Sequence, residues 1–156
     1  MSMLRDQRDL LCALNAEGVE YLVVGGHAVN MHGVPRLTKD LDVFIRGSEA
    51  NSERVFRALA KFGAPLAGLS AADFRGHEED VFQIGAAPNR VDILQAIAGV
   101  DFDAAWQRRE MFEVEDGVTA PFLSLDDLLT NKLEVARPQD IADAAHLTKM
   151  KRNGIK

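Results

Sequence analysis

Two short apolar runs constrain this chain more than any other feature, because glycines follow the first and acids begin the second. The first, Tyr21–Val24, is followed at once by Gly25 and Gly26, and after thirteen further residues Asp40 and Asp42 open the second. A strand points residues two apart to the same side, about 6.5 Å apart at their Cα atoms, so both carboxylates share one face. Two like charges this close favour a cation between them. The pattern therefore predicts a strand, a glycine turn and a second strand that carries a cation-binding pair of acids.

Length and composition place the chain among ordinary globular proteins. Its 156 residues are 47% hydrophobic and 27% charged, which predicts a single domain over residues 1–156. The net charge of −6 argues against general affinity for nucleic acid, although a nucleotide can still bind through a metal ion. The single cysteine, Cys12, excludes an internal disulfide framework and a cysteine-rich zinc site. Its place in an apolar helical pattern predicts a buried thiol.

Two absences bear on the compartment. No run approaches the roughly 18 apolar residues of a membrane-spanning helix, so no membrane association is expected. The first residues, Met1 to Asp6, lack the basic and apolar regions of a signal peptide. We therefore expect a cytoplasmic protein.

Hydrophobic periodicity and turn residues predict helices alternating with strands. The expected helices cover residues 4–17, 27–32, 48–62, 101–110, 124–136 and 138–147. The expected strands cover residues 19–24, 40–45, 81–84, 91–94, 111–114 and 118–122, the last four forming two hairpins. Residues 63–80 should form a mobile surface connection with a helical turn near 70–74, and the basic tail from Lys149 should fray. Ser48, or Asn51, and Ser124 are the expected helix caps.

A third acid, Asp92, lies between Val91 and Ile93 in one of these strands. An acid in such a setting is costly unless it reaches solvent, a cation or a hydrogen-bond partner. If this strand lies beside the one that carries Asp40 and Asp42, three carboxylates gather on one sheet surface. Three carboxylates with substrate phosphates are a usual ligand set for paired Mg²⁺ ions, which can activate an attacking oxygen and stabilise a leaving pyrophosphate.

Gly25, Gly26, Asp40, Asp42 and Asp92 together form a pattern that resembles the signature of the DNA polymerase β-like nucleotidyltransferase superfamily. A finer match resembles its small bacterial stand-alone members, which include minimal nucleotidyltransferases and abortive-infection type nucleotidyltransferase toxins. The residues of that finer match, besides the two acids of the Asp40 strand, are His32, Gly33, Arg36, Thr38, Lys132, Arg137, Pro138, Asp140 and Asp143. The resemblance covers nearly the whole chain, roughly residues 20–147.

The resemblance implies an α/β (α+β) nucleotidyltransferase fold. It would have a mixed sheet of about five strands, helices packed on the sheet and a C-terminal helical pair. It also implies a nucleoside triphosphate (NTP) as donor, two Mg²⁺ ions, and transfer of a nucleoside monophosphate to a hydroxyl group. The acceptor would be a protein, an RNA or a small molecule.

The resemblance assigns a role to each site residue. Asp40 and Asp42 would ligate both metal ions, and Asp92 would ligate the catalytic metal and act as, or orient, the base. Gly25 and Gly26 would cradle the triphosphate through backbone N–H groups at a helix start. Many members carry serine at the second glycine position, so this chain departs from the pattern by lacking that hydroxyl.

Several residues near the acids, most of them basic, have two interpretations. Arg36, Thr38 and Lys39 would either contact phosphates or buffer the acids, with Arg36 best suited to phosphate because guanidinium pairs with it in a bidentate manner. Lys132 would either reach the triphosphate or form an ion-pair cluster between the last two helices. The other members of that cluster would be Arg137, Asp140 and Asp143.

Other residues are expected to be structural. His27 and His32 are five residues apart, which does not place two zinc ligands on one helix face, so capping or packing is the expected role. Tyr21 and Trp106 are expected in the core.

Two function classes remain open on the sequence alone. The first is the Mg²⁺-dependent nucleotidyltransferase. The second is a binding module of the same fold that does not catalyse, or that forms one half of a toxin–antitoxin pair. A metal-dependent phosphoesterase finds no support in the spacing between the glycine pair and the acids.

Overall fold

The computed structural model describes residues 3–85 and 89–154. The helices are α1 (Arg5–Ala16), α2 (Gly25–Met31), α3 (Glu49–Phe62), the 3₁₀ turn η1 (Ala71–Phe74), α4 (Phe102–Gln107), α5 (Leu125–Val135) and α6 (Pro138–Gly154). The strands are β1 (Tyr21–Val24), β2 (Leu41–Ile45), β3 (Val81–Ile84), β4 (Val91–Leu94), β5 (Glu110–Glu115) and β6 (Val118–Phe122). Both predicted hairpins are confirmed, since β3 pairs with β4 and β5 with β6, each antiparallel.

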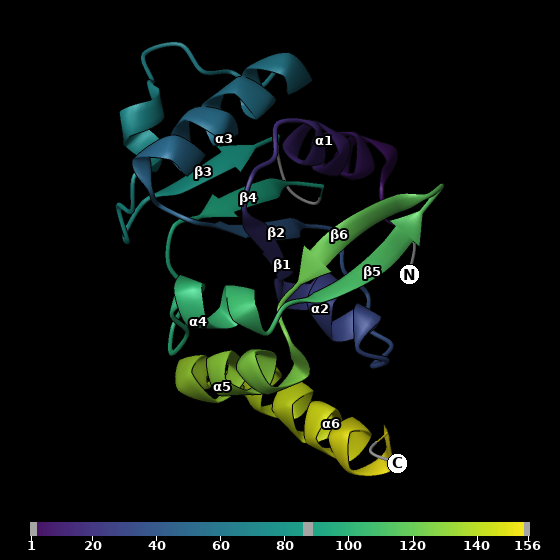
Figure 1. Ribbon diagram of the computed structural model, residues 1–156. Helices are drawn as coiled ribbons and strands as arrows, with labels where there is room; N and C mark the ends of the chain where they lie inside the picture. The colour runs from purple at the N-terminus through teal and green to yellow at the C-terminus, as the bar shows by residue number, and fades with distance from the viewer. Residues whose placement is uncertain (1–2, 86–88, 155–156) are drawn as a thin grey trace.

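The strands form one mixed sheet in the order β3-β4-β2-β1-β6-β5 (Figure 1). At its centre β1 pairs antiparallel with β2, whereas β2 pairs with β4 and β1 with β6 in parallel. The described residues therefore contain a six-stranded sheet where about five strands were expected. The mixed α/β architecture is as predicted.

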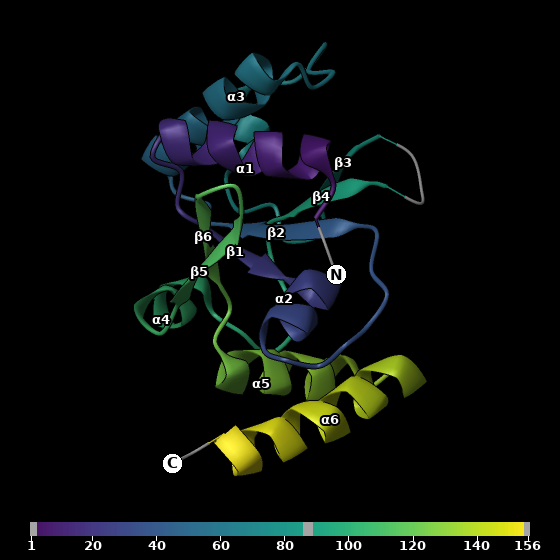
Figure 2. The ribbon, with the colours of Figure 1, turned by 90° about the vertical axis from the view of Figure 1, so that its right-hand side faces the viewer.

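Helices lie on both sides of this sheet (Figure 2). α1 and α3 pack together over one face, while α2 lies against β1 and β2 on the other. α5 and α6 pack against each other beyond α2 and form the predicted C-terminal helical pair. No helix in the described residues is long and apolar enough to cross a membrane.

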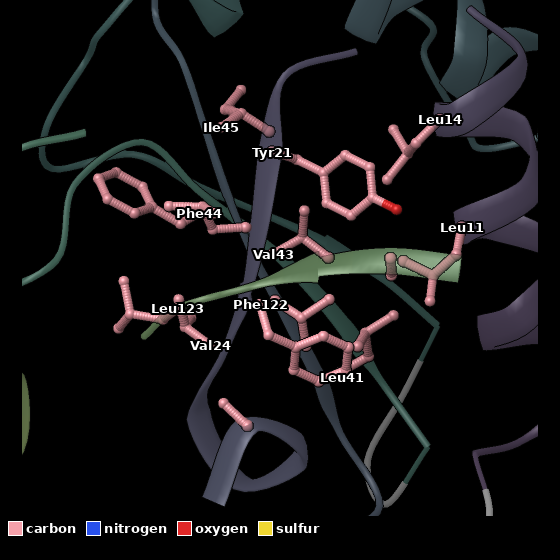
Figure 3. Packing of buried hydrophobic residues seen from close by; sticks show 14 of the residues in the cluster. Leu11, Leu14, Tyr21, Val24, Leu41, Val43, Phe44, Ile45, Phe122 and Leu123 are labelled. Carbon is pink, nitrogen blue, oxygen red and sulfur yellow. The ribbon is translucent and has the colours of Figure 1, made fainter. Parts of the chain in front are cut away.

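A large part of the core lies between the sheet and α1. Figure 3 shows Leu11 and Leu14 of α1 directed toward Tyr21 and Val43, and all four side chains are at most 1% exposed. Burying each aliphatic side chain of this kind is worth about 1.5–3 kcal/mol. Because side chains alternate along a strand, the packing of Val43 on this face directs its neighbour Asp42 to the face of α2.

The caps follow the sequence. The hydroxyls of Ser48 and Ser124 accept hydrogen bonds from backbone N–H groups at the starts of α3 and α5. The segment at residues 63–80 is largely exposed, as predicted for a surface connection. Phe74 nevertheless anchors it, being 1% exposed and packed edge-to-face on Phe82.

Several expectations were wrong at element boundaries. α2 begins at Gly25 rather than His27, so both glycines belong to its first turn. Glu110 begins β5 instead of ending a helix. The tail from Lys149 continues α6 to Gly154, and residues 155–156 lie outside the described part, as do 86–88 of the first hairpin loop.

The prediction of a buried thiol was also wrong. Cys12 is exposed, because it lies on the solvent side of α1.

Candidate active site

Strand pairing brings two of the three predicted acids together. Asp42 on β2 and Asp92 on β4 are register partners in the parallel pair, so their side chains leave the same face. The next residues along, Val43 and Ile93, point to the opposite face and are 0% exposed. The predicted adjacency of the two strands is thus confirmed. The packed face fixes the direction in which both acids point.

The third acid joins this pair through a residue that the sequence analysis did not single out. Asp40 lies just before β2, and its Oδ1 accepts a hydrogen bond of 2.9 Å from the backbone N–H of Arg90. The Arg90 guanidinium donates from Nε to Asp92 Oδ1 at 2.8 Å, and its Nη2 lies 3.5 Å from Asp40 Oδ2. Arg90 therefore bridges Asp40 and Asp92.

Sequence reasoning had a signal for Arg90 and missed it. Arg90 lies two residues before Asp92, which is the spacing that places side chains on one side of an extended chain. A cation at that spacing from a buried acid is a natural partner. The same rule that linked Asp40 to Asp42 would have found it.

The environment of Asp42 disfavours its charge. Burial raises the pKa of Asp42 to about 7, and the neighbouring carboxylates of Asp92 and Asp40 act in the same direction. The more distant charges of Lys132 and Arg90 oppose this rise. An additional cation beside the carboxylate would stabilise its ionised form.

Gly25 is required by its contact with Asp42. Its φ of +68° lies in the left-handed region, which residues with a side chain rarely adopt. A Cβ at this position would overlap Asp42 Oδ2. The first glycine therefore allows the start of α2 to approach the carboxylate closely.

Gly26 makes room for a hydroxyl from another segment. A Cβ at this position would lie 2.5 Å from Thr38 Oγ1. Thr38 thus occupies the space that a side chain at position 26 would fill. The absence of a serine hydroxyl at position 26 is accompanied by a threonine hydroxyl at nearly the same place.

Two cavities meet at this point. One of 250 Å³ and one of 400 Å³ share Gly26, Arg36 and Asp42 among their lining residues. Besides these three, the first is lined by Val24, Gly25, Leu94, Ile97, Ala98, Asn131, Lys132, Val135, Arg137 and Asp140. The second adds Leu37, Thr38, Lys39 and Asp40. Of the predicted site residues, all but Asp92 line this cleft. The cleft thus brings carboxylates, both glycines and basic side chains together.

Another cavity in the described residues is larger but lies away from these groups. It measures 570 Å³ and lies at the edge strand β3, beside Phe74 and Phe82. None of the predicted site residues lines it. We assign the site to the cleft at Asp42, because chemistry depends on the charged groups rather than on volume.

Lys132 belongs to a buried ion-pair network. Its side chain is 6% exposed, and Nζ lies 3.2 Å from both Asp140 Oδ1 and Asp143 Oδ2. Arg36 reaches Asp143 at 2.5 Å, and Arg137 reaches Asp140 at 2.6 Å. The predicted ion-pair cluster between the last two helices is confirmed. Because Lys132 also lines the cleft, the network connects α5 and α6 to the cavity that Asp42 lines.

The two histidines are structural, as expected. His27 is 5% exposed, and burial lowers its pKa to about 4, so its imidazole is neutral near pH 7. His32 forms the C-cap of α2, and its Nε2 lies 2.8 Å from the carbonyl oxygen of Leu123.

The donor set fits a hard divalent cation. Asp40, Asp42 and Asp92 supply only carboxylate oxygens, the ligands that Mg²⁺ prefers. In the described part of the chain, however, no three His, Cys, Asp or Glu side chains are already grouped as ligands of one ion. In this arrangement Arg90 takes the Asp92 oxygens that a cation would take. The residues fit the ion once that guanidinium is displaced.

The fold is that of a mixed α/β protein, and its cleft is lined by carboxylates, glycines and basic side chains. The chain belongs to the family described as nucleotidyltransferase of unknown function (DUF6036), whose model matches residues 4–151. This agrees with the nucleotidyltransferase resemblance of the sequence.

Solved structures share the fold. A protein from Thermotoga maritima, provisionally described as a nucleotidyltransferase, superposes with a TM-score of 0.57 at 20% identity, over 97% of this chain and 97% of that one. An antigenic nucleotidyltransferase-like protein from Paracoccidioides brasiliensis gives a TM-score of 0.51 at 15% identity, over 94% of this chain and 78% of that one. At these identities the similarity supports the fold alone. No curated protein sequence matches the chain significantly.

The contact between Gly25 and Asp42 can be tested against a glycine of the same backbone conformation. Gly18 has a φ of +70°, and a Cβ there would meet nothing within 4 Å. Gly18→Ala should cost only the left-handed strain, about 1 kcal/mol. Gly25→Ala should cost about 1–3 kcal/mol more, because the methyl group overlaps the carboxylate. Urea denaturation measures both, and equal losses would contradict the close approach.

The raised pKa of Asp42 predicts an unusual dependence of stability on pH. Because its pKa of about 7 in the folded protein lies above the ordinary 3.8, the folded protein binds more protons than the unfolded chain between these values. The free energy of unfolding should therefore fall as pH rises from about 4 to 7, by on the order of 3 kcal/mol. Denaturation in EDTA measures this slope, which Asp42→Asn should reduce. An unchanged slope in that variant would refute the assignment.

Proposed function

We propose that this chain is a Mg²⁺-dependent nucleotidyltransferase that transfers a nucleoside monophosphate from an NTP to a hydroxyl group. The observation that carries the proposal is the cleft that Asp42, in register with Asp92, lines together with Arg36 and Lys132. Its carboxylates suit a divalent cation, and its basic side chains suit phosphate oxygens. A triphosphate bound with Mg²⁺ presents both charges at once. Membership of a nucleotidyltransferase family supports the same reaction.

The triphosphate would lie along the start of α2. Gly25 and Gly26 are the first two residues of α2, so their backbone N–H groups have no partner within the helix and would donate to phosphate oxygens. The Thr38 hydroxyl beside Gly26, now 3.4 Å from the carbonyl oxygen of Asp40, would supply a further donor. Arg36 and Lys132 would offset negative charge that develops on the leaving pyrophosphate.

The acceptor hydroxyl would be activated at Asp92. The hydroxyl oxygen would attack the α-phosphorus of the triphosphate. The bond between the α-phosphorus and the oxygen that bridges to the β-phosphate would break, and pyrophosphate would leave. The hydroxyl proton passes to the Asp92 carboxylate, whose side chain is 13% exposed. Asp40, Asp42 and Asp92 would hold Mg²⁺, which would supply Lewis-acid stabilisation of the phosphate oxygens.

The proposal extends to the small bacterial stand-alone branch of the DNA polymerase β-like superfamily. Support comes from the late residues of the finer sequence match, Lys132, Arg137, Asp140 and Asp143, which lie together in one ion-pair network. Lys132 also lines the cleft, where the resemblance would have it reach the triphosphate. The acceptor would then be a protein, an RNA or a small molecule that carries a hydroxyl.

One observation favours a second candidate, a module of the same fold that binds a partner without catalysing, such as one half of a toxin–antitoxin pair. Arg90 already pairs with Asp40 and Asp92, so these acids have a counter-charge without any metal ion. A stable complex with a partner that survives Asp40→Asn, together with no nucleotide transfer, would favour this candidate.

The transferase proposal predicts an acid-dependent labelling reaction. Incubation with each radiolabelled NTP, Mg²⁺ and a cell extract should label an acceptor. Asp42→Asn and Asp92→Asn should each lower the rate at least about 100-fold, because each removes charge stabilisation or the base. Asp9→Asn, at an exposed position on α1 beyond the other face of the sheet, is the matched control and should label normally. Full labelling by Asp42→Asn would exclude this mechanism.

The role of Thr38 predicts a selective loss of triphosphate affinity. Thr38→Val keeps the branched shape beside Gly26 but removes the hydroxyl, so the dissociation constant for NTP with Mg²⁺ should rise about 5–10-fold. Calorimetry measures this, and circular dichroism should be unchanged. Thr119→Val, at an exposed position on β6, is the matched control. Equal affinities for both variants would show that the Thr38 hydroxyl does not contact the ligand.

A further inference from the structure

Arg90 holds the acids of the candidate site more completely than a single ion pair would. Its guanidinium contacts both oxygens of Asp92, with Nε 2.8 Å from Oδ1 and Nη2 3.4 Å from Oδ2. Nη2 also lies 3.5 Å from Asp40 Oδ2, and the backbone N–H of Arg90 donates to Asp40 Oδ1. All four carboxylate oxygens of these two acids therefore face Arg90.

We propose that Arg90 is a resident counter-cation that competes with the divalent ion for Asp40 and Asp92. This inference rests on the proposed function, since it concerns the same carboxylates. The guanidinium offsets the repulsion between the acids in the metal-free protein, and it must leave them before they can ligate a divalent ion. Arg90 thus acts as a positioning residue that lowers the affinity of the site for metal alone.

The backbone allows the side chain to leave without disturbing the sheet. The carbonyl oxygen of Arg90 accepts a hydrogen bond from the Leu41 N–H at 2.9 Å, and its own N–H is held by Asp40. Both bonds are independent of the guanidinium. The Arg90 side chain is 29% exposed, so the charged end can move into solvent. Substitutions at Arg90 should therefore change the charge at the site and preserve the pairing of β2 with β4.

The test measures Mn²⁺ binding to the full chain by calorimetry, with no nucleotide present. Arg90→Met removes the competing charge and should tighten Mn²⁺ binding about tenfold, because a contacting charge changes carboxylate affinities by that order. Arg90→Lys keeps the charge but loses the two-pronged contact, so its affinity should lie between the two. Arg57→Met removes an exposed charge of α3 that pairs with Glu17, so it controls for net charge and should match the wild type.

A second readout separates competition from a merely structural role. Without Mn²⁺, Arg90→Met should melt at a lower temperature than the wild type, because its acids lose their partner. Saturating Mn²⁺ should raise its melting temperature more than that of the wild type. A purely structural role would lower both melting temperatures equally and leave the Mn²⁺-induced rise unchanged.

The outcomes distinguish this inference from the proposed function. Mn²⁺ binding that is detectable in all variants, but equal or weaker in Arg90→Met, overturns the competition and leaves the metal site intact. Absence of Mn²⁺ binding in the wild type and in every Arg90 variant, even with NTP, overturns the metal-dependent function as well. Mn²⁺ binding that is tightest in Arg90→Met, intermediate in Arg90→Lys and unchanged in Arg57→Met supports both.

Discussion

Repulsion among Asp40, Asp42 and Asp92 is the constraint on which the rest of the structure depends. Their strands place them on one face, and burial raises the energy of each added charge. Arg90 forms ion pairs with two of the acids, Asp40 and Asp92, and the pKa of Asp42 is raised. Both effects lessen the repulsion while all three acids remain. A cluster that must be offset in this way is better explained by a ligand it binds than by its contribution to folding.

The opposite face of the sheet is what holds the acids in place. Val43 and Ile93 are fully buried next to Asp42 and Asp92, so neither strand can rotate without exposing its apolar side chain. A shift of one residue in register would move each acid into the core and cost several kcal/mol. Hydrophobic packing on one face of the sheet therefore holds Asp42 and Asp92 close together on the other, despite the repulsion between their charges.

Sequence reasoning reached the features that follow from local rules. Strand alternation placed Asp42 and Asp92 on one face, and turn residues located both hairpins. It failed where tertiary contacts decide. Position 25 must be glycine because Asp42 leaves no room for a side chain, which no one-dimensional pattern shows. The error at Cys12 was of another kind, because helical spacing itself places this residue away from the buried stripe of Leu10, Leu11 and Leu14. Arg90 was missed for another reason, since attention to acids alone overlooked the cation beside them.

The basic side chains of the cleft are compensated in the same way as its acids. Lys132 and Arg36 pair with Asp143, just as Asp92 pairs with Arg90, so both sets of charges already have partners within the protein. A lone anion would have to displace the partners of the bases, and a lone cation would have to displace Arg90 from the acids. Under the proposed function, a triphosphate bound with a divalent ion would exchange both sets of pairs in one binding event, because it brings both charges together.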